Sequence, residues 1–163
     1  MAKVVMTMGD DISTDVIYPG RYMATVLPGE TPPFAFADHA EFNGQLKSGQ
    51  VPPGSVLVAG KNFGCGSSRE QAVSTLKGHE LTVIAGSFAR IFLQNSINLG
   101  LCVVSAPGIA ASVGDELDLL PEVVVNRTSG KRYPVVQLPS ARQAIIDAGG
   151  LIPYTRQRLL ATP

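Results

Sequence analysis

Short apolar runs alternate with amphipathic segments through the middle of the chain. The runs 56–59, 81–85 and 101–105 are continuously apolar or nearly so, which is typical of strands buried on both faces. Between them, residues 68–77 and 87–99 have the periodicity of helices. The second helix would place five side chains on one face: Phe88, Ile91, Phe92, Asn95 and Leu99. This strand–helix–strand–helix–strand order predicts a small parallel sheet with right-handed crossovers.

Serine and glycine mark the expected ends of these helices. Ser87 is placed to cap the second helix, and Phe88, Ile91 and Phe92 would then belong to the core. Gly78 is expected just beyond the first helix, and Gly100 just beyond the second. The boundaries therefore follow from residue types as well as from periodicity.

The two ends of the chain have weaker patterns. Residues 3–8 read as a strand, and residues 19–53 form a long proline- and glycine-rich stretch without periodicity. Three shorter strands are expected at 116–120, 123–126 and 132–138, followed by a helix at 140–148. We find no internal repeat and no linker, so residues 1–163 are predicted to form a single α/β domain.

Charge and hydropathy exclude some functions. The chain has 13 basic and 13 acidic side chains without a basic cluster, which argues against nucleic-acid binding. No run approaches the roughly 20 apolar residues of a membrane span, and the N-terminus lacks the features of a signal peptide. We therefore expect a cytoplasmic protein that binds neither nucleic acid nor a membrane.

The two cysteines, Cys65 and Cys102, lie 37 positions apart. A disulfide is improbable in a reducing compartment. Two thiolates are also too few for the usual zinc or iron–sulfur site. No metal site is therefore predicted on this chain, and a metal used in its function would have to be held by another chain.

Residues 60–70 lie between a predicted buried strand and a predicted helix start, where open α/β sheets bind ligands. Gly64 and Gly66 would let the backbone approach a ligand closely. The helix start supplies unpaired N–H groups, and Arg69 supplies a planar guanidinium that suits a carboxylate. The loop is thus a candidate anion site.

The serines and glycines of this loop also occur in motifs with different functions. The spacing fits neither a Walker loop, because Lys61 precedes the glycines, nor a dinucleotide fingerprint, because Arg69 replaces the third glycine. A capping box formed by Ser67 with Glu70, or by Ser68 with Gln71, would account for the serines without catalysis. A hydrolase triad is a poor match, since no histidine lies nearby in sequence.

Residues 62–70, followed by 87–92 and Asn95, closely resemble the swivel domain of the aconitase superfamily. Residues 14–22 look like the N-terminal motif of that family, and 149–154 resemble the close of isopropylmalate dehydratase small subunits. The resemblance implies a swivelling β/β/α domain with a small, largely parallel central sheet. It also implies a larger partner subunit that carries a [4Fe–4S] cluster acting as a Lewis acid, with no cofactor on this chain.

The resemblance assigns roles to individual residues. Ser67 matches the serine general base, and Arg69 matches the arginine that binds the substrate carboxylate and stabilises the serine alkoxide. Ser68 matches a neighbouring hydrogen-bond donor, and Asp15 matches an acidic residue that supports this region. Gly64, Gly66 and Arg90 are expected to shape or brace the loop.

The same resemblance bears on the substrate. Related chains that act on tricarboxylates have an arginine where this chain has Ala24, and an unpaired third carboxylate would be costly to bury. Met23, Ala24 and Thr25 would instead accommodate an apolar branch, in a loop at about 22–38 expected to be mobile without the partner. Isopropylmalate in leucine biosynthesis is the expected substrate. The alternatives are 2,3-dimethylmalate, citramalate-type acids or homocitrate, and a non-catalytic carboxylate-binding module.

Overall fold

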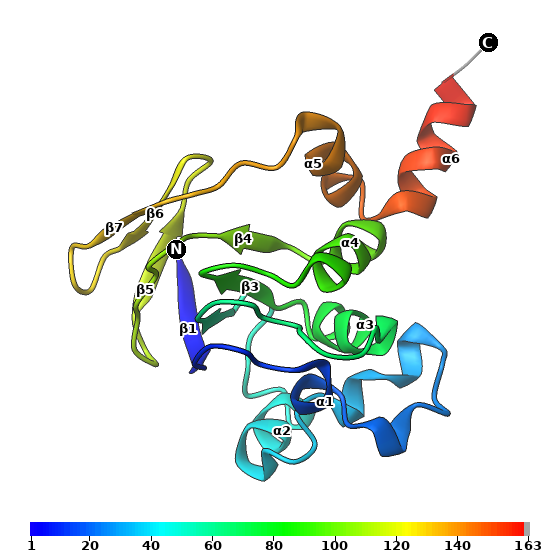
Figure 1. The fold of residues 1–163 in the computed structure, drawn as a ribbon, viewed down its shortest axis with the longest axis horizontal. Coiled ribbons are helices and arrows are strands. Elements are labelled where there is room, and N and C mark those ends of the chain that lie inside the picture. The colour runs from blue at the N-terminus through cyan, green and yellow to red at the C-terminus, as the bar shows by residue number, and fades with distance from the viewer. Residues whose placement is uncertain (162–163) are drawn as a thin grey trace.

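Seven strands form one mixed sheet in the order β4-β3-β2-β1-β5-β6-β7 (Figure 1). The computed structural model describes residues 1–161. The neighbours from β1 to β4 pair in parallel, whereas the β1–β5, β5–β6 and β6–β7 pairs are antiparallel. The strands are β1 Ala2–Thr7, β2 Val56–Ala59, β3 Thr82–Ala85, β4 Val103–Ser105, β5 Glu116–Leu119, β6 Val123–Asn126 and β7 Arg132–Pro134. The predicted α/β class is confirmed, but the sheet is parallel only in one half and antiparallel in the other, rather than largely parallel.

The parallel half is buried on both faces, as its continuous apolar runs predicted. Every residue of β2 and β3 is buried, and the two strands pair in register from Val56 opposite Thr82 to Ala59 opposite Ala85. Because side chains alternate across a strand, Leu57 contributes to one core and Val58 to another. The first core lies under the helices, and the second lies between the parallel strands and β5–β7.

Helices cover the side of the sheet away from β5–β7 (Figure 1). They are α1 Thr14–Ile17, α2 Ala40–Lys47, α3 Glu70–Gly78, α4 Arg90–Leu99, α5 Ser140–Asp147 and α6 Leu151–Ala161, with short 3₁₀ turns η1 Gly20–Tyr22, η2 Pro28–Glu30 and η3 Pro32–Phe34. The periodicity predicted α3, α4 and α5. It missed α2, which buries Phe42 and Leu46 within the proline-rich stretch, and α6, which buries no residue. Within residues 1–161 no helix is both long and apolar enough to cross a membrane.

The predicted helix starts were wrong by two or three residues. Helix α3 begins at Glu70 with Arg69 at the N-cap, and no side chain caps it, so neither serine capping box forms. Helix α4 begins at Arg90 rather than after Ser87, whose Oγ instead accepts a hydrogen bond from the backbone N–H of Asn62 at 2.9 Å. Ser67, Ser68 and Ser87 therefore do not cap a helix.

The helix ends were predicted better at one position than at the other. Gly100 ends α4 in the left-handed conformation, with φ of 73°. Gly78 is instead the last residue of α3, where a Cβ atom would overlap Cγ of Pro32. The last predicted strand also ends early, at Pro134, because the chain then crosses to β4, where the N–H of Val136 donates to the carbonyl of Ser105 at 2.8 Å.

The loop at 22–38 is attached to α3 at its middle. Thr31 is fully buried, its Oγ1 lies 2.9 Å from Oγ of Ser74, and its carbonyl accepts a hydrogen bond from Oγ1 of Thr75 at 2.9 Å. Residues on its N-terminal side are exposed, among them Met23, Val26 and Leu27. The mobility of this loop stays a prediction.

Gly100 allows a test of how tightly α4 packs on the turn before α6. In Gly100→Ala the new Cβ would overlap the carbonyl carbon of Gly149, in addition to the cost of the positive φ. We expect a loss of about 3 kcal/mol in the free energy of unfolding, measured by urea denaturation. Gly108→Ala is the matched control, because Gly108 has φ of 78° but open space around its Cα, and should lose only about 1 kcal/mol. Equal losses in the two variants would show that the contact with Gly149 is not tight.

Candidate active site

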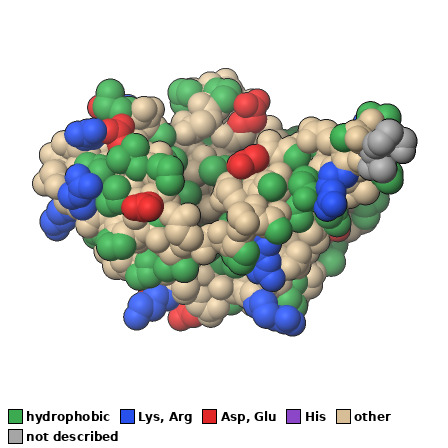
Figure 2. Space-filling view, turned by 90° about the horizontal axis from the view of Figure 1, so that it is seen from above, with side chains coloured by type: hydrophobic (Ala, Val, Ile, Leu, Met, Phe, Trp, Pro, Cys, Tyr) green, Lys and Arg blue, Asp and Glu red, His purple; other side chains and the backbone are tan. Residues whose placement is uncertain are grey.

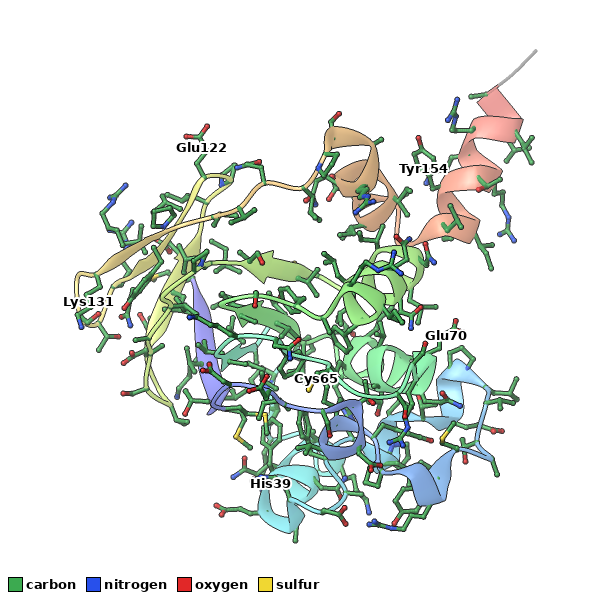
Figure 3. All side chains as sticks on the ribbon, viewed as in Figure 1. His39, Cys65, Glu70, Glu122, Lys131 and Tyr154 are labelled. Carbon is green, nitrogen blue, oxygen red and sulfur yellow. The ribbon has the colours of Figure 1, made fainter. Side chains whose placement is uncertain are left out.

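A cavity of about 230 Å³ opens where the starts of α3 and α4 approach each other. We call it the helix-entrance cavity. It is lined by Thr14, Gly64, Gly66, Ser67, Ser68, Arg69, Ala89, Arg90, Ile91, Phe92 and Asn95. The loop that supplies its serines runs from near Cys65, in the middle of the molecule, to Glu70 at the first turn of α3 (Figure 3).

Glycine is required at the base of the cavity. Gly64 has φ of 81°, and a Cβ atom there would overlap Cγ of Phe92, inside the ring stack of the core. Gly66 has φ of 88° and borders Ser13 and Thr14. These two glycines let the loop turn twice between β2 and α3 while lying directly on α4.

The N-terminal segment fixes the loop through its backbone. The N–H of Thr14 donates to the carbonyl of Cys65 at 2.8 Å, and its hydroxyl donates to the carbonyl of Ser67 at 2.8 Å. The N–H of Gly64 donates in turn to the carbonyl of Ile12 at 2.8 Å. Because a peptide plane carries its C=O and N–H on opposite sides, the N–H of Ser68 faces away from Thr14.

Arg69 is held rigidly at the edge of the cavity. Its Nη1 pairs with Oδ1 of Asp15 and donates to the carbonyl of Tyr18 at 3.1 Å, while its side chain is 11 % exposed. Its Nε is buried and has no hydrogen-bond partner. Gly20 makes room for this arrangement, since a Cβ there would lie 3.2 Å from Nη2 of Arg69.

Asp15 stays ionised in this setting. The guanidinium of Arg69, followed by the backbone N–H of Gly20 at 2.9 Å, holds the pKa of the Asp15 carboxyl below its ordinary value. The carboxylate therefore keeps Arg69 in place without occupying all of its hydrogen-bond donors, because a guanidinium carries five N–H groups.

N–H groups without a backbone acceptor lie at the starts of both helices that border the cavity. In the described part of the chain, the backbone N–H groups of Ser67, Ser68 and Glu70 have no backbone acceptor, and those of Arg90 and Ile91 have none either. Neither α3 nor α4 has a side-chain cap. Both positive dipole ends and the guanidinium of Arg69 thus favour an anion in the same space.

The structure brings most of the predicted site residues together. Ser67 and Ser68 are exposed, and together with Arg69 they line the cavity. Gly64, Gly66 and Arg90 line it as well, although the Arg90 side chain makes no hydrogen bond among residues 1–161 that would brace the loop. Asp15 lies behind Arg69.

The predicted substrate loop lies apart from this cavity in the isolated chain. Met23, Ala24 and Thr25 do not line it, and the carbonyl of Met23 accepts a long hydrogen bond, 3.4 Å, from Nε2 of Gln71 on α3. Their contact with substrate stays a prediction that requires the partner subunit or a movement of the loop.

Sequence reasoning placed Ile91 in the core, and this was wrong. Because α4 begins at Arg90, its inward face is formed by Phe92, Ser96 and Ile97, and Ile91 is 47 % exposed at the rim of the cavity. Asn95, one turn further on, shares this rim. Sequence patterns also missed the role of Thr14, which has the residue type of an ordinary turn position. Only the fold shows that its hydroxyl binds the carbonyl of Ser67.

Residues 1–161 contain no group of three or more histidine, cysteine, aspartate or glutamate side chains that could hold a metal ion. Cys65 is partly buried and Cys102 is exposed. The donor set of this chain therefore does not fit an iron–sulfur cluster, which is usually held by several thiolates.

The pairing of Asp15 with Arg69 predicts a pH dependence of stability. Because the pKa of Asp15 is lowered in the folded chain, the pair stabilises the fold above the ordinary pKa near 3.8, and this stabilisation is lost as the pH falls through the folded value. The difference in unfolding free energy between the wild type and Asp15→Asn should be constant from about pH 7 to about pH 4 and should shrink below that. Urea unfolding at a series of pH values measures it, and a difference that persists at about pH 2 would contradict the assignment.

Comparison with known proteins gives a consistent family. Residues 35–107 match the model of the aconitase C-terminal domain. The 3-isopropylmalate dehydratase small subunit of Moorella thermoacetica is 45% identical over 159 residues, covering 94% of this chain and 93% of the relative. The isopropylmalate/citramalate isomerase small subunit of Methanocaldococcus jannaschii is 40% identical, covering 95% and 93%.

A solved structure agrees with these relatives. The crystal structure of 3-isopropylmalate dehydratase from Methanocaldococcus jannaschii superposes with a TM-score of 0.85 at 39% identity, covering 97% of this chain and 94% of that one. The likeness thus extends over sequence and fold together, and the chain belongs to the family of 3-isopropylmalate dehydratase small subunits, within the aconitase superfamily.

Proposed function

We propose that this chain is the swivel subunit of a cytoplasmic 3-isopropylmalate dehydratase and interconverts 2- and 3-isopropylmalate with a larger partner. The single observation that carries the proposal is geometric: Ser67 and Arg69 line one cavity between two uncapped helix starts. The names of the relatives supply the reaction. The cavity supplies groups suited to a malate-type dianion.

In this proposal Ser67 is the general base that takes the proton from the carbon beside a carboxylate. A serine hydroxyl is a very weak acid in water, so its alkoxide must be stabilised by its surroundings. Preorganised N–H donors and a nearby guanidinium do this most strongly where water is excluded. The exposed position of Ser67 on an open cavity means that closure by the partner would supply the dry environment.

Arg69 binds a substrate carboxylate and stabilises the alkoxide. Its Nη1 is bound to Asp15 and Tyr18, and its Nε is buried, which leaves Nη2 as the remaining donor for a carboxylate. Ser68, whose N–H faces away from Thr14, adds a further donor. The guanidinium is thus oriented before the substrate arrives, which lowers the entropic cost of binding.

The iron–sulfur cluster belongs, in this proposal, to the large subunit. The cluster supplies Lewis-acid chemistry for the loss of hydroxide when bound there. This chain would contribute proton transfer and carboxylate binding, the two tasks for which its cavity has groups.

One alternative substrate has specific support. The relative from Methanocaldococcus jannaschii is named for both isopropylmalate and citramalate, which differ in the size of their apolar branch. The exposed apolar side chains of Met23, Val26 and Leu27 suit such branches and offer no cation for a third carboxylate. We therefore propose isopropylmalate as the main substrate and citramalate-type acids as the second candidate.

Ser67→Ala tests the catalytic proposal. With the large subunit present, we expect kcat to fall by about 10³-fold or more while KM changes little, because the hydroxyl acts on the carbon-bound proton rather than on ground-state binding. The thermal midpoint should not change, since the side chain is exposed. Turnover of isopropylmalate by the reconstituted pair is the measurement.

Ser140→Ala is the matched control, because Ser140 is an exposed serine at the first turn of α5 and lies outside the cavity. Its kcat should equal that of the wild type. Retained activity in Ser67→Ala would refute the proposal. Binding of malates by the isolated chain, with no turnover when the partner is added, would favour a carboxylate-binding module instead.

Ala24→Arg tests the role of the substrate loop. A guanidinium at this position would pair with a third carboxylate, so the ratio of kcat/KM for homocitrate-type tricarboxylates over isopropylmalate should rise by about tenfold or more. Ala24→Gln, which adds bulk without charge, is the control and should lower both values without raising the ratio. An unchanged ratio in Ala24→Arg would remove Ala24 from the specificity determinants.

A further inference from the structure

Helix α6 presents an apolar face that nothing in the described chain covers. The helix projects from the body beyond α5 and ends beside the C-terminus (Figure 1). It buries none of its 11 residues, and Leu159 is 72 % exposed. One face of it forms a shallow groove lined by Leu151, Ile152, Thr155, Arg156, Leu159 and Leu160. Hydrophobic side chains gather along this arm of the surface, next to the grey terminal residues (Figure 2).

This face is continuous with a second hollow nearer the body. A cavity of about 440 Å³ joins α6 to the loop at 22–38 and to the last turns of α3 and α4. Ile152 lines both the groove on α6 and this cavity. On the loop side its wall is formed by Pro28 and Gly29, next to the exposed Val26 and Leu27.

Helix α4 connects this surface to the helix-entrance cavity. Ile91 and Asn95 line the helix-entrance cavity, and Asn98 and Leu99 line the cavity beside α6. These four positions have the spacing i, i+4, i+7 and i+8, which places them on one stripe of a helix. A single surface therefore runs from Ser67 along α4 to Leu159.

We propose that α6 is a docking helix for the large catalytic subunit. This inference rests on the proposed function, in which the partner closes over the helix-entrance cavity. A partner that covers Ile91 and Asn95 and continues along the same stripe of α4 would reach Leu99 and Ile152. The exposed apolar face of α6 thus extends the interface that the reaction itself requires.

Size and charge disfavour a second copy of this chain as the occupant. The face of α6 alone measures roughly 16 by 10 Å, an area of about 160 Å². This is well below the roughly 800 Å² that each partner buries in a stable interface. The helix carries Arg156 and Arg158 and no acidic residue, so pairing α6 with itself would bring like charges together. The fitting partner has an apolar groove rimmed by carboxylates and spans the surface from the cavity to α6.

Leu159→Glu in the full-length chain tests this docking. Titration with the cluster-bearing large subunit should show a half-saturating concentration raised by at least about tenfold, since the change puts a carboxylate into an apolar contact. At saturating partner, kcat should equal that of the wild type, because Leu159 lies outside the cavity that contains Ser67. Circular dichroism and the thermal midpoint should not change, since the side chain is exposed.

Gln157→Glu is the matched control, because it adds the same charge to the same helix on the opposite face. Its half-saturating concentration should stay within about twofold of the wild type. Binding is also measured directly, by sedimentation of the labelled chain with the large subunit, so that absence of turnover in the wild-type pair would count against the proposed function and not against docking.

Two results would overturn the inference. The first is a titration curve for Leu159→Glu that equals that of the wild type. If the isolated variant then also changed from a dimer to a monomer, the face would be assigned to a second copy of this chain. The second is a lower kcat at saturating partner with an unchanged half-saturating concentration, which would make α6 part of the catalytic machinery.

Discussion

The candidate site depends on one set of contacts between segments more than fifty residues apart. Thr14 fixes the carbonyls of Cys65 and Ser67, and Asp15 fixes the guanidinium of Arg69. Each carbonyl turned toward the N-terminal segment leaves an N–H on the other side of its peptide plane. The same contacts that close the fold therefore aim the donors that an alkoxide and a carboxylate need.

The sheet explains why these segments meet. Strands β1 and β2 are neighbours and run in parallel, so the residues that follow them emerge at the same edge. The turn after β1 carries Thr14 and Asp15, and the turn after β2 carries Ser67 and Arg69. The turn after β3 adds Ala89 and the start of α4. A site with residues from three connections is thus a consequence of strand order.

The sequence was most informative where one environment dominates a segment. Strands β2 and β3 are buried on both faces, so all of their positions except Thr82 are apolar and the pattern is plain. Helix α2 was missed because its two buried residues, Phe42 and Leu46, follow a proline-rich stretch whose 3₁₀ turns have no periodicity. Helix α6 was missed because it packs little against the chain, and its leucines therefore do not form an inward stripe.

The misplaced helix starts show what local patterns cannot supply. Ser67, Ser68 and Ser87 are good capping residues, yet none of them caps a helix. The Oγ of Ser87 instead accepts a hydrogen bond from the N–H of Asn62, and the hydroxyl of Thr14 donates to the carbonyl of Ser67. A serine left uncommitted at an uncapped helix start is a better catalytic candidate than a capping serine, since capping would bind its hydroxyl to the backbone. The uncapped helix starts and the stripe along α4 lie on one surface, which indicates that this surface is completed by a second protein chain.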